Sequence, residues 1–210
     1  MGRISVTESV TLDGIMQGLG RVDEDTRSGF ARGGWGAGYQ DEVSMTFMGE
    51  RMTGEGVMLF GRRTYEDMLG YWTAATDPNP FTQYLTQVQK YVVSRAPNPS
   101  TMKLDHPNST LLTGEATHTV RDLKDRTDGN ITILGSGELV RALHTAGMVD
   151  EYILQIHPIV LGQGTALFGA ADRANLTLQR SVTTTTGVII AQYSVTPVSS
   201  GSDEAESGDR

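Results

Sequence analysis

Short apolar runs alternate along the chain with segments of helical periodicity, a pattern typical of an α/β protein. The apolar runs bounded by glycine or polar residues predict strands at 3–9, 56–61, 90–94, 110–112 and 131–134. Helical periodicity lies between them, at 39–53, 62–69, 82–88, 117–126 and 138–147. We therefore expect a single α/β domain with a mixed sheet flanked by helices.

The two ends of the ordered chain carry the clearest strand patterns. The first strand alternates Ile4 and Val6 with polar residues, which predicts one buried face. After the Asp13-Gly14 turn signal, a glycine-rich loop of the length usually found in functional or mobile segments runs to about Gly38. Near the C-terminus, runs 176–184 and 188–196 meet at Thr186-Gly187 and predict an antiparallel hairpin at the sheet edge.

Composition narrows the class of protein. The 210 residues, 38% hydrophobic and 20% charged, suit one soluble domain over 1–198, and residues 199–210 form an acidic, apolar-poor segment expected to be disordered. The net charge of −8 argues against nucleic acid as a partner, and no apolar run is long enough for a membrane helix. With no cysteine, four scattered histidines and no signal peptide, we expect no metal site and a cytoplasmic location.

The segment from Ile131 to Gly162 predicts a strand, a glycine turn, a helix and a second strand. Its turn, Gly135-Ser136-Gly137, lets the backbone approach a phosphate at a helix N-terminus, although a tight connection without a ligand explains the same pattern. A Rossmann fingerprint is excluded because Val140 replaces the third glycine. The acids Asp150 and Glu151 also precede the next strand instead of ending it.

A second turn of the same kind follows the strand at 56–61. It places Gly61, Arg62, Arg63 and Thr64 at a helix start, and Ser94-Arg95 ends another strand. Each arginine alone fits a solvated surface position equally well. Together they favour a ligand with several phosphates, and arginines accommodate a 2′-phosphate, so NADPH fits better than NADH.

These motifs resemble a known family. Gly61-Arg-Arg-Thr-Tyr-Glu resembles the cofactor-binding helix start of the dihydrofolate reductase fold. The segments 133–137, 149–152 and 158–164, with Thr11-Leu-Asp-Gly14, are similar to the C-terminal reductase domain of the bifunctional riboflavin-biosynthesis deaminase/reductase. The matches span residues 3–196. The resemblance implies a dihydrofolate-reductase-like, mostly parallel central sheet with an antiparallel C-terminal hairpin, and NADPH lying across the strand ends.

The resemblance also implies roles for the residues at those turns. Gly61, Arg62, Arg63 and Thr64 are expected at the pyrophosphate and adenosine-side phosphates, and Ser94 and Arg95 at the 2′-phosphate. Gly135, Ser136, Gly137 and Glu138 are expected along the pyrophosphate and nicotinamide side, with the Glu138 side chain pointing away from phosphate. The loop from Asp13 is expected to cover the nicotinamide.

The substrate side departs from dihydrofolate reductases, which carry a Trp-Pro segment and one acid on the following helix. Trp35 is followed by Gly36, and the nearest acid, Asp41, does not align with certainty. Asp13 and Asp41 are the candidates for proton delivery, with a turn residue and a helix-start acid as the structural alternatives. Trp35, Tyr39 and Phe47 are the candidate walls for a flat heteroaromatic substrate, although core packing explains Phe47 equally well.

The resulting hypothesis is an NADPH-dependent reductase of a small heterocyclic substrate, resembling 5-amino-6-(5-phosphoribosylamino)uracil reductase. Dihydrofolate reductase is the first alternative. A non-catalytic nucleotide-binding protein that kept the pocket is the second. The resemblance further implies a homodimer formed through sheet-edge or C-terminal strands.

Overall fold

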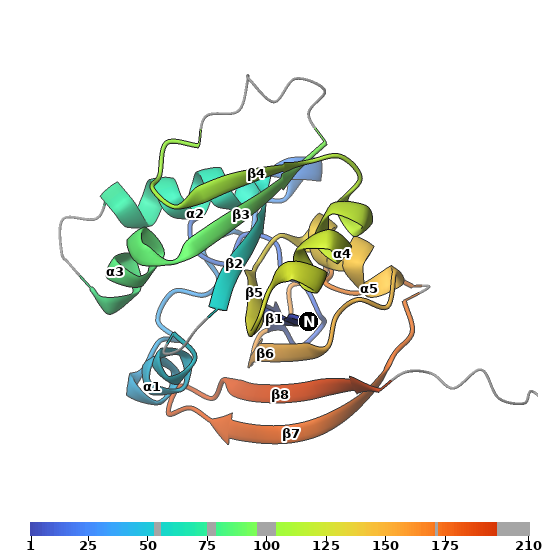
Figure 1. Ribbon diagram of the computed structural model, residues 1–210. Coiled ribbons are helices and arrows are strands. Elements are labelled where there is room, and N and C mark those ends of the chain that lie inside the picture. The colour runs from blue at the N-terminus through green and yellow to red at the C-terminus, as the bar shows by residue number, and fades with distance from the viewer. Residues whose placement is uncertain (53–55, 75–78, 96–103, 171, 197–210) are drawn as a thin grey trace, which may run out of the picture.

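A single mixed sheet organises the protein, as the computed structural model shows (Figure 1). The structure describes residues 1–52, 56–74, 79–95, 104–170 and 172–196, so the predicted acidic tail at 199–210 and the end of the domain at 197–198 lie outside the described residues. The strands are β1 (Arg3–Thr11), β2 (Gly56–Gly61), β3 (Gln89–Ser94), β4 (Ser109–Thr113), β5 (Asn130–Leu134), β6 (Glu151–His157), β7 (Asn175–Thr183) and β8 (Ile189–Thr196). The helices are α1 (Glu42–Glu50), α2 (Arg62–Ala74), α3 (Pro80–Gln87), α4 (Ala116–Arg126), α5 (Gly137–Thr145) and the 3-10 turn η1 (Arg27–Gly29).

The strand order β4-β3-β2-β5-β1-β6-β8-β7 confirms the predicted fold class. Strands β1 to β6 pair in parallel, whereas β8 pairs antiparallel with β6 and β7 antiparallel with β8. The hairpin turns at Gly187, which adopts φ 85°. Because parallel strands end at the same edge of the sheet, the turns after β1, β2, β3 and β5 share that edge.

Two apolar layers cover the two faces of the sheet. Helices α4 and α5 cover one face, where Leu123 and Leu143 pack with Val6 and Ile133 in the largest core cluster. On the opposite face, α2 and α3 pack on β2 and β3, while Phe47 of α1 packs on β6 and β8. Figure 1 shows α4 and α5 on one side of the sheet and α1 and α3 on the other.

Strand β1 is buried more completely than its alternating sequence predicts. Its residues after Arg3 are all buried, so the prediction of one buried face is wrong. The physical reason is its position, because β1 lies between β5 and β6 inside the sheet, and α4 and α5 cover the face that carries Ile4 and Val6. The polar side chains of one face are accommodated by hydrogen bonds, as when Ser5 Oγ donates to Glu151 Oε2 at 2.7 Å.

Two predicted helix boundaries also change. Gly70 does not end α2, which continues to Ala74, because Trp72 beyond it packs edge-to-face on Phe81 at 5.0 Å. That packing offsets the propensity cost of about 1 kcal/mol for an internal glycine. Helix α1 begins at Glu42 instead of Tyr39, because Asp41 caps it: its carboxylate accepts from the Ser44 N–H while the Ser44 hydroxyl accepts from the Asp41 N–H.

Candidate functional site

The two predicted glycine turns lie against each other at the C-terminal edge of the parallel strands. The Gly61 N–H donates to Ser136 Oγ at 2.9 Å, and the Gly135 N–H donates to the Thr7 carbonyl at 3.3 Å. A side chain added at Gly135 would lie 3.3 Å from Thr64 Cγ2. The glycines therefore allow a close approach of the two strand-to-helix connections, both of which are predicted to bind the cofactor.

The turn that starts α5 is conformationally strained. Gly135 and Ser136 both adopt positive φ, 63° and 70°, and a non-glycine residue in this region costs about 1–3 kcal/mol. Ser136 is the N-cap residue of α5, but its side chain makes no capping hydrogen bond because the hydroxyl is used by Gly61. The first turn of α5 thus presents backbone donors and the positive end of the helix dipole, which favour an anion.

Arginines from separate parts of the chain gather at that first turn. Arg63 Nη1 lies 3.3 Å from Glu138 Oε1, and Arg95 Nη2 lies 3.2 Å from Glu138 Oε2. The Glu138 carboxylate is the ion-pair partner of both arginines. The expectation that this side chain points away from a bound phosphate stays a prediction. Arg62 does not join this group; its Nε pairs with Glu66, one turn along α2, at 2.8 Å. Ser94 is buried at the end of β3.

Asp13 holds two loops together. Its carboxylate accepts from the Thr11 hydroxyl and from the Leu161 and Gly162 N–H groups, the last at 2.7 Å. The Thr11 hydroxyl and these N–H groups lower the pKa of Asp13 to about 2. An ionised carboxylate with every contact used for structure has no proton to deliver at neutral pH, so the geometry does not support the predicted proton-delivery role.

Asp41 is occupied in the same manner. Besides Ser44, its carboxylate accepts from the Thr185 N–H at 2.6 Å and from the Thr185 hydroxyl at 2.7 Å. The Ser44 N–H and the Thr185 groups lower the pKa of Asp41 to about 2. The alternative of a helix-start acid fits these contacts, and proton delivery does not.

An aromatic group does form at the predicted substrate side, with a member that the sequence did not single out. His157, at the end of β6, lies edge-to-face between Trp35 and Tyr39, with ring centroids 5.1 and 5.2 Å away. Burial lowers the pKa of His157, which keeps the ring neutral at neutral pH. The Trp35 indole N–H donates to the Gln17 carbonyl at 2.7 Å, which fixes the ring within the loop.

Phe47 belongs to a different core cluster from Trp35, although Tyr39 packs against the cluster of Phe47. Phe47 is buried between α1 and the sheet, packed with Ile153, Val188 and Ile190, and Arg180 stacks over its ring at 4.7 Å. Core packing therefore accounts for Phe47, and the structure does not place it with Trp35 as a substrate wall.

Glu8 is a second residue that sequence reasoning missed. It lies on β1 among the apolar residues that face α5, paired in register with Leu154, and its Oε2 has no hydrogen-bond partner among the described residues. Burial raises the pKa of Glu8 to about 8, and the charge of Glu24 adds a smaller increase. A hydrogen bond from the Ser9 backbone lowers this pKa and only partly offsets the effect of burial. The sequence carries one signal for this position, because Glu8 alternates in step with Ile4, Val6 and Val10 and so lies on the same, apolar face of the strand.

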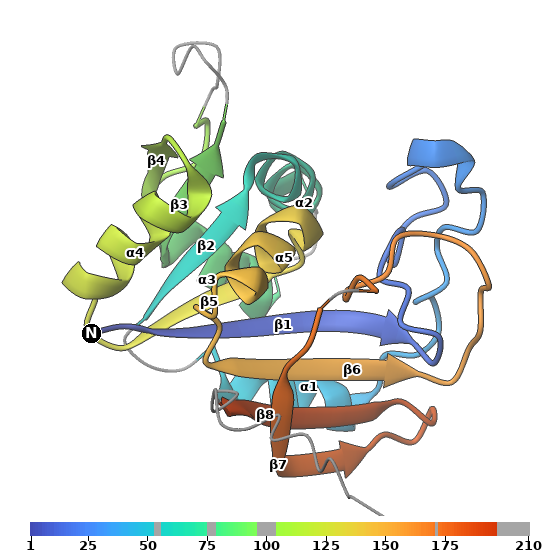
Figure 2. The ribbon, with the colours of Figure 1, turned by 90° about the vertical axis from the view of Figure 1, so that its right-hand side faces the viewer.

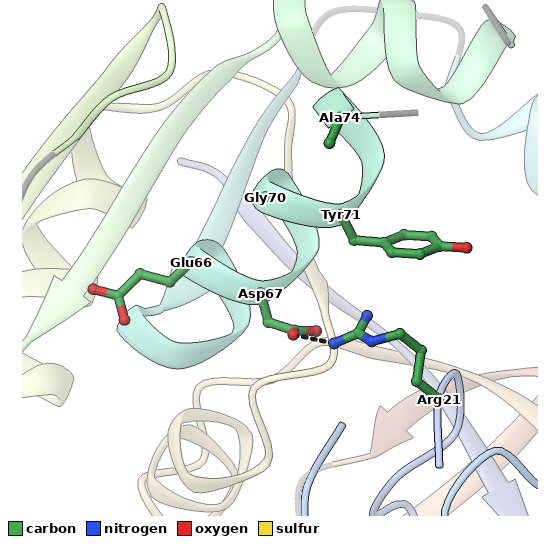
Figure 3. Close-up of a pocket in the computed structure, with 6 residues that line it drawn as sticks. All are labelled: Arg21, Glu66, Asp67, Gly70, Tyr71 and Ala74. Atoms are coloured by element: carbon green, nitrogen blue, oxygen red, sulfur yellow. Dashed lines mark hydrogen bonds and ion pairs between the residues drawn. The ribbon is translucent and has the colours of Figure 1, made fainter. Parts of the chain in front are cut away.

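The loop after β1 is attached to α2 as well as to α5. Arg21 pairs with Asp67 and lies over the Tyr71 ring, at the wall of an open cavity of about 560 Å³ (Figure 3). Neither this cavity nor a second one of about 520 Å³ between α1 and β7 includes the glycine turns. Within the described residues no His, Asp and Glu cluster is arranged to hold a metal ion, and no helix there is long and apolar enough to cross a bilayer.

Comparison with known proteins identifies the family of this chain. The family model for the RibD C-terminal domain matches residues 3–190. The chain belongs to the RibD C-terminal domain family. One relative is the uncharacterized protein YyaP of Bacillus subtilis strain 168, which is 29% identical over 196 residues, covering 91% of this chain and 94% of YyaP.

Solved structures of other proteins share the fold of this chain. A Shewanella sp. PV-4 protein named provisionally for riboflavin biosynthesis has a TM-score of 0.63 and 17% identity, covering 93% of this chain and 99% of that one. Dihydrofolate reductase from Enterococcus faecalis, solved with NADP(H), has a TM-score of 0.56 and 14% identity, covering 93% of this chain and 98% of its own. At these identities the likeness establishes the dihydrofolate-reductase-like fold.

Proposed function

We propose that the protein is an NADPH-dependent reductase of a small heterocyclic substrate. The observation that carries this proposal is the convergence of Arg63 and Arg95 on the first turn of α5, directly beside the paired turns of Gly61 and Ser136. Guanidinium groups, helix N-terminal donors and close backbone approach are the features that bind the phosphates of a dinucleotide. The E. faecalis reductase of the same fold was solved with NADP(H), which supports the choice of cofactor.

The residues at the turns fit such a cofactor. A Cβ at Gly137 would lie 1.7 Å from Met16 Cε, so the Met16 side chain would have to move, and a Cβ at Gly135 would lie 3.3 Å from Thr64 Cγ2. The two glycines leave the backbone open to close approach by another group. The backbone N–H groups of the turn, with Arg63 and Arg95, would hold the phosphates. When bound, NADPH supplies the hydride; the chain has to orient both reactants and exclude water.

The aromatic group suits a flat substrate ring. Trp35, Tyr39 and the neutral ring of His157 come from the loop after β1 and from the end of β6. Figure 2 shows that loop beside the segment after β6, beyond the ends of both strands, and the backbone bond from Met16 N–H to Thr165 O joins them. Given the RibD C-terminal domain family, a ribosylamino-pyrimidine is the substrate class we propose.

Folate reduction receives no comparable support. It calls for a carboxyl on the helix after the tryptophan that is free to meet a pterin, and both Asp41 oxygens are engaged by Ser44 and Thr185. The test begins with titration of the purified protein with NADPH and NADH, followed by fluorescence. Oxidation of NADPH at 340 nm (the band lost when the dihydronicotinamide is oxidised) is then measured with the aminopyrimidine and with dihydrofolate.

The outcomes of these assays are distinct. Tighter binding of NADPH than NADH, with oxidation only in the presence of the aminopyrimidine, supports the proposal. Oxidation of NADPH with dihydrofolate, and not with the aminopyrimidine, would indicate a dihydrofolate reductase. Binding of NADPH without turnover of either acceptor favours a nucleotide-binding protein, and no binding of NADPH refutes the reductase proposal itself.

A further inference from the structure

Glu138 is the shared partner of three arginines from three separate segments. In addition to Arg63 and Arg95, Arg27 Nη1 lies 3.5 Å from Glu138 Oε1. These arginines belong to the loop after β1, the first turn of α2 and the end of β3. One carboxylate thus faces three guanidinium groups, and the cluster retains an excess of positive charge at the start of α5.

Arg27 is held in place from its other side. Its Nε donates to Asp25 Oδ1 at 2.7 Å, and its Nη2 pairs with Asp25 Oδ2. The Gln17 amide donates to the backbone carbonyls of Asp25 and Arg27, at 3.2 and 3.1 Å. Because the guanidinium is oriented by Asp25, the Nη1 group that faces Glu138 is fixed by the loop and does not depend on Glu138 alone.

The position of the Glu138 carboxylate marks where an anion is most stable in this cluster. The three arginines would repel one another without it, and a carboxylate in the first turn of a helix is also favoured by the helix dipole. A carboxylate contributes one negative charge, whereas a phosphate monoester carries about −1.5 to −2 at neutral pH and offers three acceptor oxygens. A phosphate monoester is therefore the competitor for these arginines, and a ribose hydroxyl is not.

We propose that Glu138 is an internal counter-ion that a phosphate of the cofactor displaces, and that Arg27 is the third arginine of this phosphate site. The three arginines then set specificity, because a doubly charged 2′-phosphate replaces their bonds to Glu138 with stronger ones and a ribose hydroxyl does not; Glu138 lowers the affinity that the phosphate gains. This inference rests on the proposed NADPH-dependent function and adds to it Arg27, from a loop that the motifs do not include.

The test compares binding of adenosine 2′,5′-bisphosphate and 5′-AMP, and of NADPH and NADH, to the wild-type protein and three variants. Glu138→Gln removes the counter-ion and Arg27→Gln removes the third arginine. Glu50→Gln is the matched control, because Glu50 is 51% exposed and pairs with Arg180, while Glu138 is 55% exposed. Dissociation constants come from calorimetry at two salt concentrations, and circular dichroism checks that each variant is folded.

Glu138→Gln should tighten binding of NADPH and the bisphosphate by about fivefold, the scale of exposed ion pairs, and leave NADH and 5′-AMP unchanged. Arg27→Gln should weaken binding of NADPH and of the bisphosphate by a similar factor, and this effect should shrink at high salt. Glu50→Gln should match the wild type. Unchanged or weaker NADPH binding in Glu138→Gln, or unchanged binding in Arg27→Gln, overturns this inference; absence of NADPH binding to the wild type overturns the proposed function instead.

Discussion

The buried carboxyl of Glu8 should make the protein less stable as the pH rises. Glu8 is enclosed on the central strand, and burial raises its pKa from 4.5 to about 8. At pH 7 the folded protein therefore keeps Glu8 protonated, while the unfolded chain ionises it. The folded state binds more protons between these two values, so the free energy of unfolding falls with increasing pH.

The size of the effect follows from the difference in pKa. Each pH unit in this window changes the free energy of unfolding by about 1.4 kcal/mol, so the whole window corresponds to roughly 5 kcal/mol as an upper bound. The stability that protonated Glu8 contributes is fully present below pH 4.5 and is lost as the pH passes through about 8. A domain typically has only about 5–15 kcal/mol in total, so the effect is measurable by ordinary denaturation.

Glu8→Gln isolates this contribution, because glutamine has nearly the same shape and cannot ionise. Urea unfolding of both proteins, followed by circular dichroism at pH 5, 7 and 9, gives the difference in free energy at each pH. The free energy of unfolding of Glu8→Gln, relative to that of the wild type, should rise by several kcal/mol between pH 5 and pH 9. All other groups titrate in both proteins and cancel in the difference, and Glu50→Gln serves as the exposed control. A difference that stays constant from pH 5 to pH 9 would refute a protonated Glu8 in the folded state.

Three further predictions concern residues with structural contacts. Asp13→Ala should lower the melting temperature at pH 7, because the N–H groups of Leu161 and Gly162 lose their acceptor. Since the pKa of Asp13 in the folded protein is about 2, its stabilising contribution is present above pH 4 and disappears towards pH 2. Scanning calorimetry should therefore find the same melting temperature for both proteins at pH 2. Glu151→Leu should cost about 3–5 kcal/mol in urea unfolding, because it strands Arg51, paired at 2.6 Å, and leaves Ser5 and Gln192 without their acceptor; a loss below 1 kcal/mol would contradict this reasoning. His157→Ala should cost about 1–3 kcal/mol and shift the fluorescence of Trp35, whose ring loses its edge-to-face neighbour, and an unchanged emission maximum would count against that contact.

The fold was predictable because its signals are local. Apolar runs that end at glycine, followed by helical periodicity, specify strand-turn-helix units, and two units of this kind at Gly61 and Gly135 imply parallel strands. The hairpin was equally explicit at Gly187. What the sequence did not specify was the order of the strands. That order places β1 inside the sheet and buries both of its faces, so the polar side chains of Ser5 and Thr7 lie in the interior.

The same distinction divides the site. Gly61, Arg63, Ser136 and Glu138 follow strand ends that any parallel sheet aligns, so the motifs predict that these residues share one edge of the sheet. Their direct contact also depends on the pairing of β2 with β5, which the strand order sets. The direction of the Glu138 side chain could not be predicted, because it depends on ion pairs over 43 to 111 positions in the chain. Dimerisation, which the resemblance implies, stays a prediction.

The substrate side depends on long-range contacts that carry no local signal. The loop after β1 is positioned by single side chains: Gln17, which bonds to Thr165 as well as to the Asp25 and Arg27 carbonyls, and Asp13, which holds Gly162. This loop supplies Trp35 to the aromatic group and Arg27 to the arginine cluster. Since one loop reaches both sides, a change at Gln17 should disturb substrate and cofactor binding together, whereas a change at a glycine turn should act on the cofactor alone.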